Sequence, residues 1–300
     1  MILLTGATGL VGSALLPRLT ASGVPVRCLV RDPRRLGPER VRVQIALGDL
    51  ADPPSFRNAM RGVRTVVHLA AAIRDQPGGS IEELNGIATW RMVEAAERAG
   101  VEHFVFFSAL GATAHDRTRF LRAKALAQDA VQSAGLRTTV VAPSLVYSPG
   151  DAWLTMLGRM SLLPAMPLSG RGRALFQPIW AEDVADCIVA LLQRADGERR
   201  ERHELAGPET LSHEAIVRLA VQATGRSRRL VKVPAAVVRR TLKVSEALLG
   251  AATPATWDEA ELLEVSLTAR RGAAGTRALG VEPRRMAEVL GVGSAFPAAA

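Results

Sequence analysis

The segment Thr5-Gly6-Ala7-Thr8-Gly9-Leu10-Val11-Gly12 decides the fold, because it joins a short apolar run to a helical pattern. Its glycines have G-x-x-G-x-x-G spacing. Gly6 permits a tight turn, Gly9 lets the backbone approach a diphosphate, and Gly12 lets the helix pack close to the strand. The helix N-terminus then offers free N–H groups and partial positive charge to the phosphates. The segment therefore predicts a dinucleotide-binding turn between a first strand and a first helix.

Strand-like and helix-like segments alternate on either side of this turn. The strand candidates are short and rich in Val, Ile and Phe, as expected for strands buried on both faces; they are residues 2–5, 26–31, 41–47, 65–70, 104–108 and 138–142. The helix candidates are followed by, or end close to, a glycine; they are residues 10–22, 55–61, 82–99 and 118–134. This alternation predicts an α/β fold with a doubly wound parallel (Rossmann) sheet. Pro17 conflicts with the first helix, where it should remove one hydrogen bond or cause a kink.

After about residue 143 the regular alternation stops. Proline and glycine cluster in residues 143–150 and 164–172. Helical patterns follow at residues 182–194, 212–224, 235–249, 256–267 and 284–290. The second half therefore predicts a smaller, mainly helical C-terminal lobe.

These patterns define the expected domains. The nucleotide-binding domain covers residues 1–150 and takes strand and helix contributions from about 175–210. The smaller lobe covers residues 151–174 and 211–300 and would contact a substrate or partner. The dense charge run over residues 194–202 predicts a solvated loop.

Composition and charge exclude several protein classes. The 300 residues include 38 Lys+Arg against 29 Asp+Glu, a net charge of +9, and 48% are apolar. These values exclude a disordered or fibrous chain. No apolar run approaches the roughly 20 residues of a spanning helix, and the first residues do not resemble a signal peptide. Two cysteines, Cys28 and Cys187, exclude a disulfide scaffold and a cysteine-rich zinc site, so we expect a cytoplasmic protein without a metal.

The end of the second strand indicates which nucleotide binds. An acidic residue there would bind the adenosine ribose hydroxyls, whereas an arginine accommodates a ribose phosphate. Arg31 occupies this position, with Arg34 and Arg35 behind it. Asp32 follows directly and could still turn inward. The pattern favours NADP(H) over NAD(H), and Arg34 and Arg35 could equally belong to an exposed loop.

Several further motifs occur in a fixed order. They are the glycine-rich segment, Gly48-Asp49-Leu50, His68-Leu69-Ala70-Ala71, Ser108, Lys124, Pro143-Ser144-Leu145-Val146-Tyr147, Gln177-Pro178-Ile179, Glu182-Asp183-Val184-Ala185 and Glu204-Leu205-Ala206-Gly207-Pro208. Together they resemble the short-chain dehydrogenase/reductase superfamily, in its extended and atypical branches of NAD(P)-dependent epimerase/dehydratase-like proteins. The resemblance covers most of residues 1–210.

The resemblance and the glycine turn together give the expected cofactor contacts: Gly6, Thr8, Gly9, Leu10, Val11, Gly12, Arg31, Asp49, Leu50, Leu69, Ala70, Ala71, Lys124, Pro143 and Val146. The resemblance implies that Asp49 meets the adenine amino group and Leu50 its ring. It also implies that Lys124 holds the nicotinamide ribose and that the segment from Pro143 to Val146 closes over the nicotinamide. The alternatives are that Asp49 is a turn residue and Lys124 an exposed helix lysine.

The catalytic pattern implied by the resemblance is incomplete. The superfamily uses a serine and a Tyr-x-x-x-Lys pair, in which the tyrosine transfers a proton and the lysine one turn later lowers its pKa. Here Phe120 stands four residues before Lys124, and the only tyrosine, Tyr147, has Asp151 at that spacing. Ser108 and Lys124 remain as catalytic candidates. Losing a general acid typically costs about 10²–10⁴-fold in rate, whereas nucleotide binding should survive.

Other groups could supply the missing acid. The candidates near the expected pocket are His115, Asp116 and Asp151. Asp183 starts a helix and is explained as well by capping. His68 lies in an apolar strand and is expected to be a buried, hydrogen-bonded histidine.

Residues 226–243 contain seven basic residues and no acidic one. Within the helix predicted from residue 235, apolar and basic residues fall on different sides. The favoured interpretation is a core-facing helix with a solvated basic face; the alternative is contact with an anionic membrane surface or an acidic partner. The chain is also similar to the nucleotide-binding accessory subunit of respiratory complex I, and that likeness implies nearness to a membrane. No helix-turn-helix or zinc signature supports direct nucleic-acid binding.

Three functional hypotheses follow. The first is an atypical protein that binds NADP(H) in a structural or sensing role, or runs a reaction that needs no tyrosine. The second is an active NAD(P)-dependent reductase or epimerase/dehydratase that uses another acid on a small carbonyl, quinone or sugar-nucleotide substrate. The third is a regulator that reads the cofactor through a partner protein or DNA.

Overall fold

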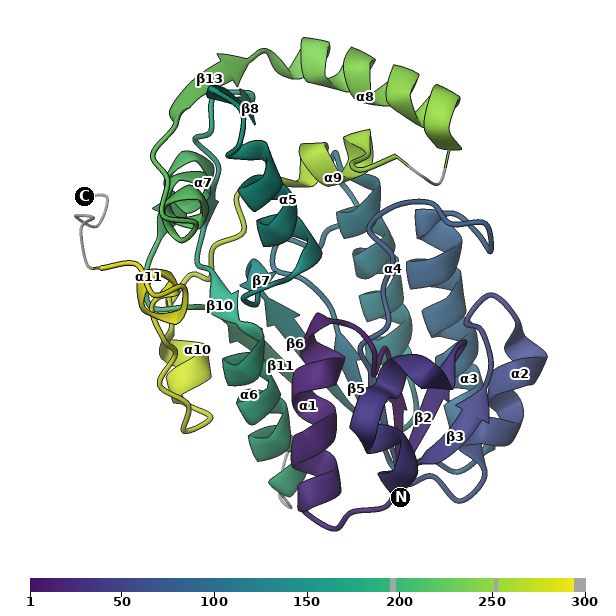
Figure 1. Ribbon diagram of the computed structural model, residues 1–300. Coiled ribbons are helices and arrows are strands. Elements are labelled where there is room, and N and C mark those ends of the chain that lie inside the picture. The colour runs from purple at the N-terminus through teal and green to yellow at the C-terminus, as the bar shows by residue number, and fades with distance from the viewer. Residues whose placement is uncertain (195–197, 251–252, 294–300) are drawn as a thin grey trace.

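A seven-stranded parallel sheet lies between layers of helices in the lower half of the molecule as drawn in Figure 1. The computed structural model describes residues 1–194, 198–250 and 253–293. In spatial order the strands are β11 (Arg200–Leu205), β6 (Arg137–Pro143), β5 (His103–Phe107), β4 (Thr65–His68), β1 (Ile2–Thr5), β2 (Val26–Val30) and β3 (Gln44–Leu47). All neighbouring strands are parallel. The chain order reverses between β1 and β4, which places a ligand crevice at the carboxyl ends of these strands.

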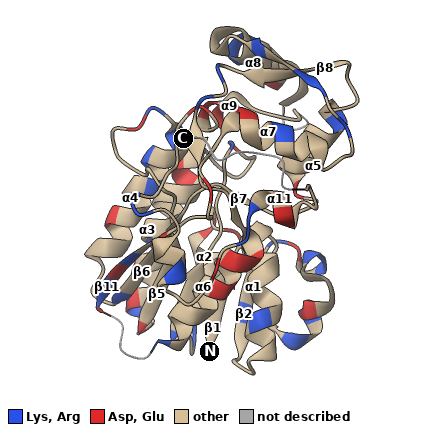
Figure 2. Cartoon of the chain, turned by 90° about the vertical axis from the view of Figure 1, so that its left-hand side faces the viewer, with Lys and Arg blue, Asp and Glu red and all other residues tan. Residues whose placement is uncertain are grey.

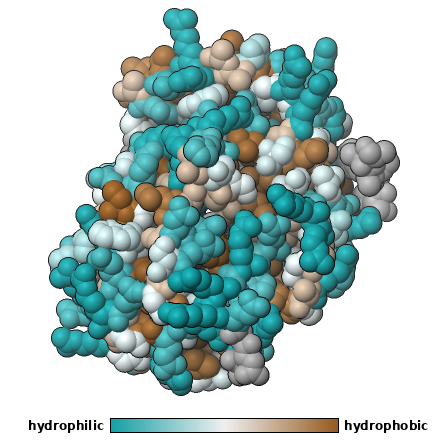
Figure 3. Space-filling view, turned by 180° about the vertical axis from the view of Figure 1, so that it is seen from behind, coloured by the Kyte–Doolittle hydropathy of each residue, from teal (hydrophilic) through white to brown (hydrophobic). Residues whose placement is uncertain are grey.

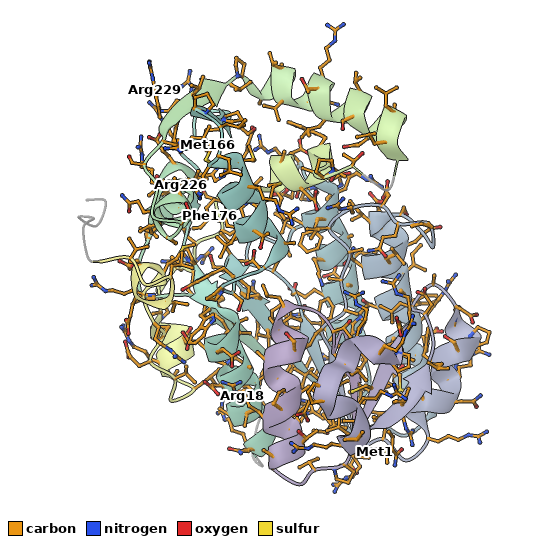
Figure 4. All side chains as sticks on the ribbon, in the orientation of Figure 1. Met1, Arg18, Met166, Phe176, Arg226 and Arg229 are labelled. Carbon is orange, nitrogen blue, oxygen red and sulfur yellow. The ribbon has the colours of Figure 1, made fainter. Side chains whose placement is uncertain are left out.

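Helices cover both faces of the sheet, as the alternation predicts. One face carries α1 (Leu10–Ala21) and α6 (Ala181–Gln193), and the other carries α2 (Pro53–Arg57), α3 (Ala88–Arg98) and α4 (Arg119–Ser133). Arg18 joins α1 to α6 through ion pairs with Glu182 and, at 2.6 Å, Asp186 (Figure 4). The doubly wound Rossmann fold is therefore confirmed.

The element boundaries agree with the prediction with a few physical exceptions. Strand β3 begins three residues late, because 3₁₀ turns occupy Pro33–Arg42. The helix expected over 82–99 starts with a π-helical turn, Glu83–Ile87, before α3. Pro17 stays inside α1 on its exposed side. Proline has no N–H to donate to the carbonyl of Ser13, four residues earlier. That carbonyl also lies on the exposed side and can bind water.

The second half is mainly helical with short strand pairs. Its helices are α5 (Ala152–Met160), α7 (His213–Gln222), α8 (Ala235–Leu249), α9 (Trp257–Leu262), α10 (Ala274–Arg277) and α11 (Met286–Val289). Its strand pairs are β7 (Val146–Tyr147) with β10 (Ile179–Trp180), β9 (Leu175–Phe176) with β12 (Leu211–Ser212), and β8 (Ala165–Ser169) with β13 (Arg229–Val233). In Figure 4, Met166 and Phe176 lie within this part of the molecule, beside α7.

Three predictions about the second half need correction. The charge run at 194–202 is not wholly a loop, because Arg200–Leu205 forms the edge strand β11; residues 195–197 lie outside the described residues. The helix expected over 256–267 ends at Leu262, since the Leu267 N–H donates to the Leu175 carbonyl at 2.8 Å. Helix α8 has the predicted bounds, but none of its residues is buried, so the core-facing interpretation is wrong.

Polar contacts hold the C-terminal part against the strand ends. The Ser144 hydroxyl donates to the Leu267 carbonyl at 2.6 Å, and the Ala269 N–H donates to Gln177 Oε1 at 2.7 Å. The guanidinium of Arg74 pairs with Glu259 of α9 at 2.9 Å. Helix α9 is thereby fixed beside the crevice. In the described part of the chain, no helix is long and apolar enough to cross a membrane.

A candidate nucleotide-binding cleft

A cavity of about 620 Å³ opens at the carboxyl ends of the parallel strands. All the expected cofactor contacts line it: Gly6, Thr8, Gly9, Leu10, Val11, Gly12, Arg31, Asp49, Leu50, Leu69, Ala70, Ala71, Lys124, Pro143 and Val146. Residues far apart in the sequence are thus brought to one cleft at the topological switch point, where doubly wound sheets bind ligands.

The glycine-rich turn has no room for side chains at two of its positions. Gly6 has φ +71°, and a Cβ there would lie 2.6 Å from the Ala70 nitrogen. A Cβ at Gly12 would lie 2.7 Å from the Ala7 Cα. Gly9 is the N-cap of α1 and brings no capping side chain. The first N–H groups of α1 therefore lie at the cleft without a side-chain partner, which is the arrangement that binds a diphosphate.

Two arginines lie at the end of the cleft formed by β2 and β3. Arg31 is exposed, donates to Gln76 Oε1 at 3.1 Å and lies 4.0 Å from the Asp49 carboxylate. Arg35 also lines the cleft. Asp32 instead accepts from the Arg34 backbone N–H at 3.0 Å and pairs with its guanidinium. Asp32 therefore does not turn inward, and neither it nor Arg34 is among the lining residues.

Lys124, Phe120 and Ser108 lie together at the opposite end of the cleft. The Lys124 side chain is buried, its ammonium donates to the Phe107 carbonyl at 2.7 Å, and its Nζ lies 5.6 Å from the Phe120 ring centroid. Burial lowers the pKa of Lys124 to about 7. Lys124 is therefore not an exposed helix lysine. The Ser108 hydroxyl donates to Gln128 Oε1 at 3.2 Å.

The residues considered as substitute acids lie outside this cleft. His115 is exposed, and the carboxylate of Asp116 accepts bonds from Thr118. Asp151 caps α5 by accepting from the Leu154 N–H at 2.7 Å. Asp183 lies in the first turn of α6 and pairs with Arg284. None of the four lines the cavity, so the structure brings none of them to Lys124.

Two other ring side chains considered from the sequence, His68 and Tyr147, are buried. His68 is buried and hydrogen-bonded to the hydroxyls of Thr5 at 2.7 Å and Thr89 at 3.0 Å. Burial lowers its pKa to about 3, so it stays neutral, as the expectation of a buried histidine requires. Tyr147 is fully buried, and burial raises the pKa of its phenol.

Several residues that line the cleft are not predicted by the sequence patterns. Leu262 and Leu267 reach the cleft from the C-terminal part, and Gln76 and Leu84 come from the connection after β4. Asn85 holds that connection in place, because its side chain bonds both the N–H and the carbonyl of Ala72. No local pattern marks Leu262 or Leu267, since only tertiary packing brings them to the strand ends.

Comparisons with known proteins agree with this geometry. The model of a family described as NAD(P)H-binding matches residues 6–195. Subunit 9 of the NADH dehydrogenase [ubiquinone] 1 alpha subcomplex, mitochondrial, from Arabidopsis thaliana is 29% identical over 240 residues. The alignment covers 76% of this chain but 59% of that subunit, so the chain spans under two thirds of its length.

Two further comparisons cover more of the partner chain. Sterol demethylase protein B from Methylococcus capsulatus is 30% identical over 260 residues, 77% of each chain. The crystal structure of Thermus thermophilus UDP-glucose 4-epimerase in complex with NAD superimposes with a TM-score of 0.71 and 18% identity, covering 96% of both chains. At that identity the superposition supports the fold alone.

Proposed function

Because the chain belongs to the NAD(P)H-binding family, with the epimerase/dehydratase-like fold of short-chain dehydrogenases/reductases, we propose that its cleft holds NADP(H) in a site without the usual phenol. The observation that carries the proposal is the phenyl ring of Phe120 beside buried Lys124. The protein would then serve a bound-nucleotide structural or sensing role, or run a redox reaction that needs no tyrosine.

The residues present fit the dinucleotide along the length of the cleft. The uncapped start of α1 suits the diphosphate. Arg31 and Arg35 suit a ribose phosphate, because a guanidinium binds phosphate oxygens in a fork. Asp49 and Leu50 suit the adenine, and the buried ammonium of Lys124 suits ribose hydroxyls. This assignment explains why one cleft carries arginines at one end and a single lysine at the other.

Proton supply decides whether the site turns over. A bound nicotinamide provides a hydride, and a reduced carbonyl oxygen must also receive a proton. Phe120 has no proton to give, and the Ser108 hydroxyl is not an acid at neutral pH. Among the described residues that line this end of the cleft, Lys124 is the one ionisable group. Ser108 would orient a polar group, and Lys124 would orient the ribose.

A second candidate is an active reductase or epimerase/dehydratase on a small carbonyl, quinone or sugar-nucleotide. The observation that favours it is the pKa of Lys124, which burial brings to about 7. A group with a pKa near the operating pH is suited to general acid catalysis. In this case Lys124 replaces the missing phenol as the proton donor.

Nucleotide titration and the substitution Phe120→Tyr distinguish the two candidates. We expect NADPH to bind more tightly than NADH by fluorescence titration. Phe120→Tyr should raise turnover of a general carbonyl substrate by about 10²-fold or more. The matched control is Phe107→Tyr, which adds a phenol in the same cleft but not one turn before Lys124; it should leave turnover unchanged.

Two results of these experiments would decide against one or both candidates. A dissociation constant above about 1 mM for both nucleotides would exclude both candidates. Substantial wild-type turnover that Phe120→Tyr does not change would support the second candidate over the first.

The proposal also covers the surroundings of the site. Cys28 and Cys187 are buried free thiols, as is usual in a reducing cytoplasm. Burial raises the pKa of both thiols to about 12, so neither is a reactive nucleophile. Residues 1–150, with contributions from about 175–210, form the nucleotide-binding domain. Residues 151–174 and 211–300 form the lobe that meets a substrate or partner.

A further inference from the structure

Helix α8 and strand β13 form an arm, residues 229–249, that the nucleotide site leaves unused. Figure 1 shows α8 as the outermost helix, at the end of the molecule far from the N-terminus. None of its 15 residues is buried. Val237 and Val244 are each 52% exposed and Leu248 is 79% exposed. A helix of a globular protein normally buries its apolar stripe, so an exposed one indicates an interaction surface.

Three of the four large apolar side chains that α8 exposes form one ridge, and the fourth, Leu249, lies on another side of the helix. At about 100° per residue, Val237, Val244 and Leu248 project within about 40° of one another. Arg240 and Lys243 follow on one side of the ridge, and both are exposed. Figure 3 shows hydrophobic side chains among hydrophilic ones at this end of the molecule. On the side of the cations, Val244, Arg240 and Lys243 also line a hollow that Trp257 and Glu261 of α9 border. The ridge and its cations form one amphipathic face beside this hollow.

The charge of α8 itself is mainly positive, with three basic residues and one acidic residue. Figure 2 shows Lys and Arg along α8 at the top of the molecule. The one acidic residue of the helix, Glu246, accepts from the Trp257 backbone N–H at 2.6 Å and so faces α9. Arg239 stacks over the Trp257 ring at 5.7 Å, also toward α9. In Figure 4, Arg229 of β13 lies at the same end of the molecule.

We propose that α8 lies flat on a membrane surface that contains anionic phospholipids. Val237, Val244 and Leu248 enter the boundary of the acyl chains, while Arg240 and Lys243 reach the lipid phosphates along their flexible stems. A helix of 15 residues is too short to span the bilayer, which needs about 20. The helix therefore lies in the interface.

The size of the ridge favours a bilayer over a protein partner. A bilayer accepts a narrow ridge, because its area is not fixed by a matching pocket. Each cation near an anionic surface adds about 1 kcal/mol, which is about fivefold in binding.

Vesicle co-sedimentation of the full chain tests the proposal. Wild type should sediment with vesicles of phosphatidylcholine and phosphatidylglycerol, weakly with pure phosphatidylcholine, and less at high salt. Arg240→Gln with Lys243→Gln should weaken binding by about 25-fold at low salt. Val244→Ser with Leu248→Ser should also weaken it by at least tenfold. The control pair is Arg57→Gln with Arg91→Gln, two exposed cations on α2 and α3, which should leave vesicle binding unchanged.

Each alternative outcome overturns the proposal. If wild type sediments with neither kind of vesicle, membrane binding by α8 is excluded. Binding that the two glutamines abolish but the two serines leave intact means that the ridge does not enter the bilayer. A dimer in light scattering that Leu248→Ser dissociates assigns the ridge to a second copy. Far-ultraviolet circular dichroism and thermal unfolding of every variant monitor folding independently of nucleotide binding.

Discussion

The Nζ atom of Lys124 lies 5.6 Å from the centroid of the Phe120 ring, one helical turn away on α4. It also lies 5.0 Å from the Phe106 ring and donates to the Phe107 carbonyl. An ammonium in this position has aromatic faces and one carbonyl in place of water. Cation–π contacts partly compensate for its lost hydration, but its pKa still falls to about 7. The buried ammonium of Lys124 thus lies in a largely apolar site, beside a Phe120 ring that carries no hydroxyl.

This lysine should make stability depend on pH in the alkaline range. The unfolded lysine has a pKa near 10.4, and the folded one about 7. Between these values the unfolded state binds more protons, so the free energy of unfolding should rise as the pH is raised from 7 to 10. Lys124→Met should abolish most of this slope and should be more stable than wild type near pH 7. Urea denaturation at pH 7, 8.5 and 10 measures both effects.

Lys243→Met is the matched control, because Lys243 is exposed on α8. Its slope should equal that of wild type. An unchanged alkaline slope in Lys124→Met would show that Lys124 is solvated and charged in the folded protein.

The choice between NADPH and NADH should depend on Arg31. A charge-assisted hydrogen bond to phosphate contributes about 1.5–3 kcal/mol, so Arg31→Ala should weaken NADPH about 10- to 100-fold. NADH lacks that phosphate, so its affinity should change less than threefold. The affinity could also rise, because Asp49, the proposed adenine contact, no longer has the Arg31 cation 4.0 Å away competing for its carboxylate. Fluorescence titration of both nucleotides gives the ratio.

Arg34→Ala serves as the control for Arg31, since Arg34 pairs with Asp32 and does not line the cleft. It should leave both affinities close to wild type. Equal losses of NADPH and NADH in Arg31→Ala would refute the assignment of Arg31 to the ribose phosphate.

Local sequence patterns predicted the strands of the sheet and the glycine-rich turn, but they did not predict which residues meet through tertiary packing. Strand β1 and helix α8 have the predicted bounds, because apolar runs and helical spacing are local signals. The edge strand β11 reads Arg-Glu-Arg-His-Glu-Leu, and its polar edge position hid it in a charge run. Nothing local told whether Lys124 was buried, or that Leu262 would reach the cleft. Both depend on how α4 and α9 pack.

The ion pairs of Arg119 should stabilise the position of α9 beside the nucleotide cleft. Its guanidinium contacts Glu82 at 2.7 Å, Asp75 at 3.0 Å and Asp258 of α9 at 3.3 Å. Arg119→Gln leaves three carboxylates without their shared cation, so the free energy of unfolding should fall by about 1–3 kcal/mol at pH 7. NADPH should also bind more weakly, because α9 contributes Leu262 to the cleft. Thermal and urea unfolding, together with nucleotide titration, measure these changes.

The pH dependence distinguishes an electrostatic effect from a packing effect. Hydrogen bonds from Arg119 lower the pKa of Glu82. For Asp75, burial is the largest single effect and raises the pKa, but the hydrogen bonds from Arg119 and the Ile81 N–H, together with the Arg119 charge, outweigh it, so both pKa values are depressed. Depressed carboxylates stabilise the fold above their unfolded pKa, near 4, and this contribution is lost as the pH falls through the folded pKa. The difference between wild type and Arg119→Gln should therefore shrink below pH 4. Arg64→Gln, which breaks the exposed pair with Glu102, should leave the free energy of unfolding close to that of wild type at every pH, because solvent screens an exposed pair. A constant deficit down to pH 3 in Arg119→Gln would assign its effect to packing.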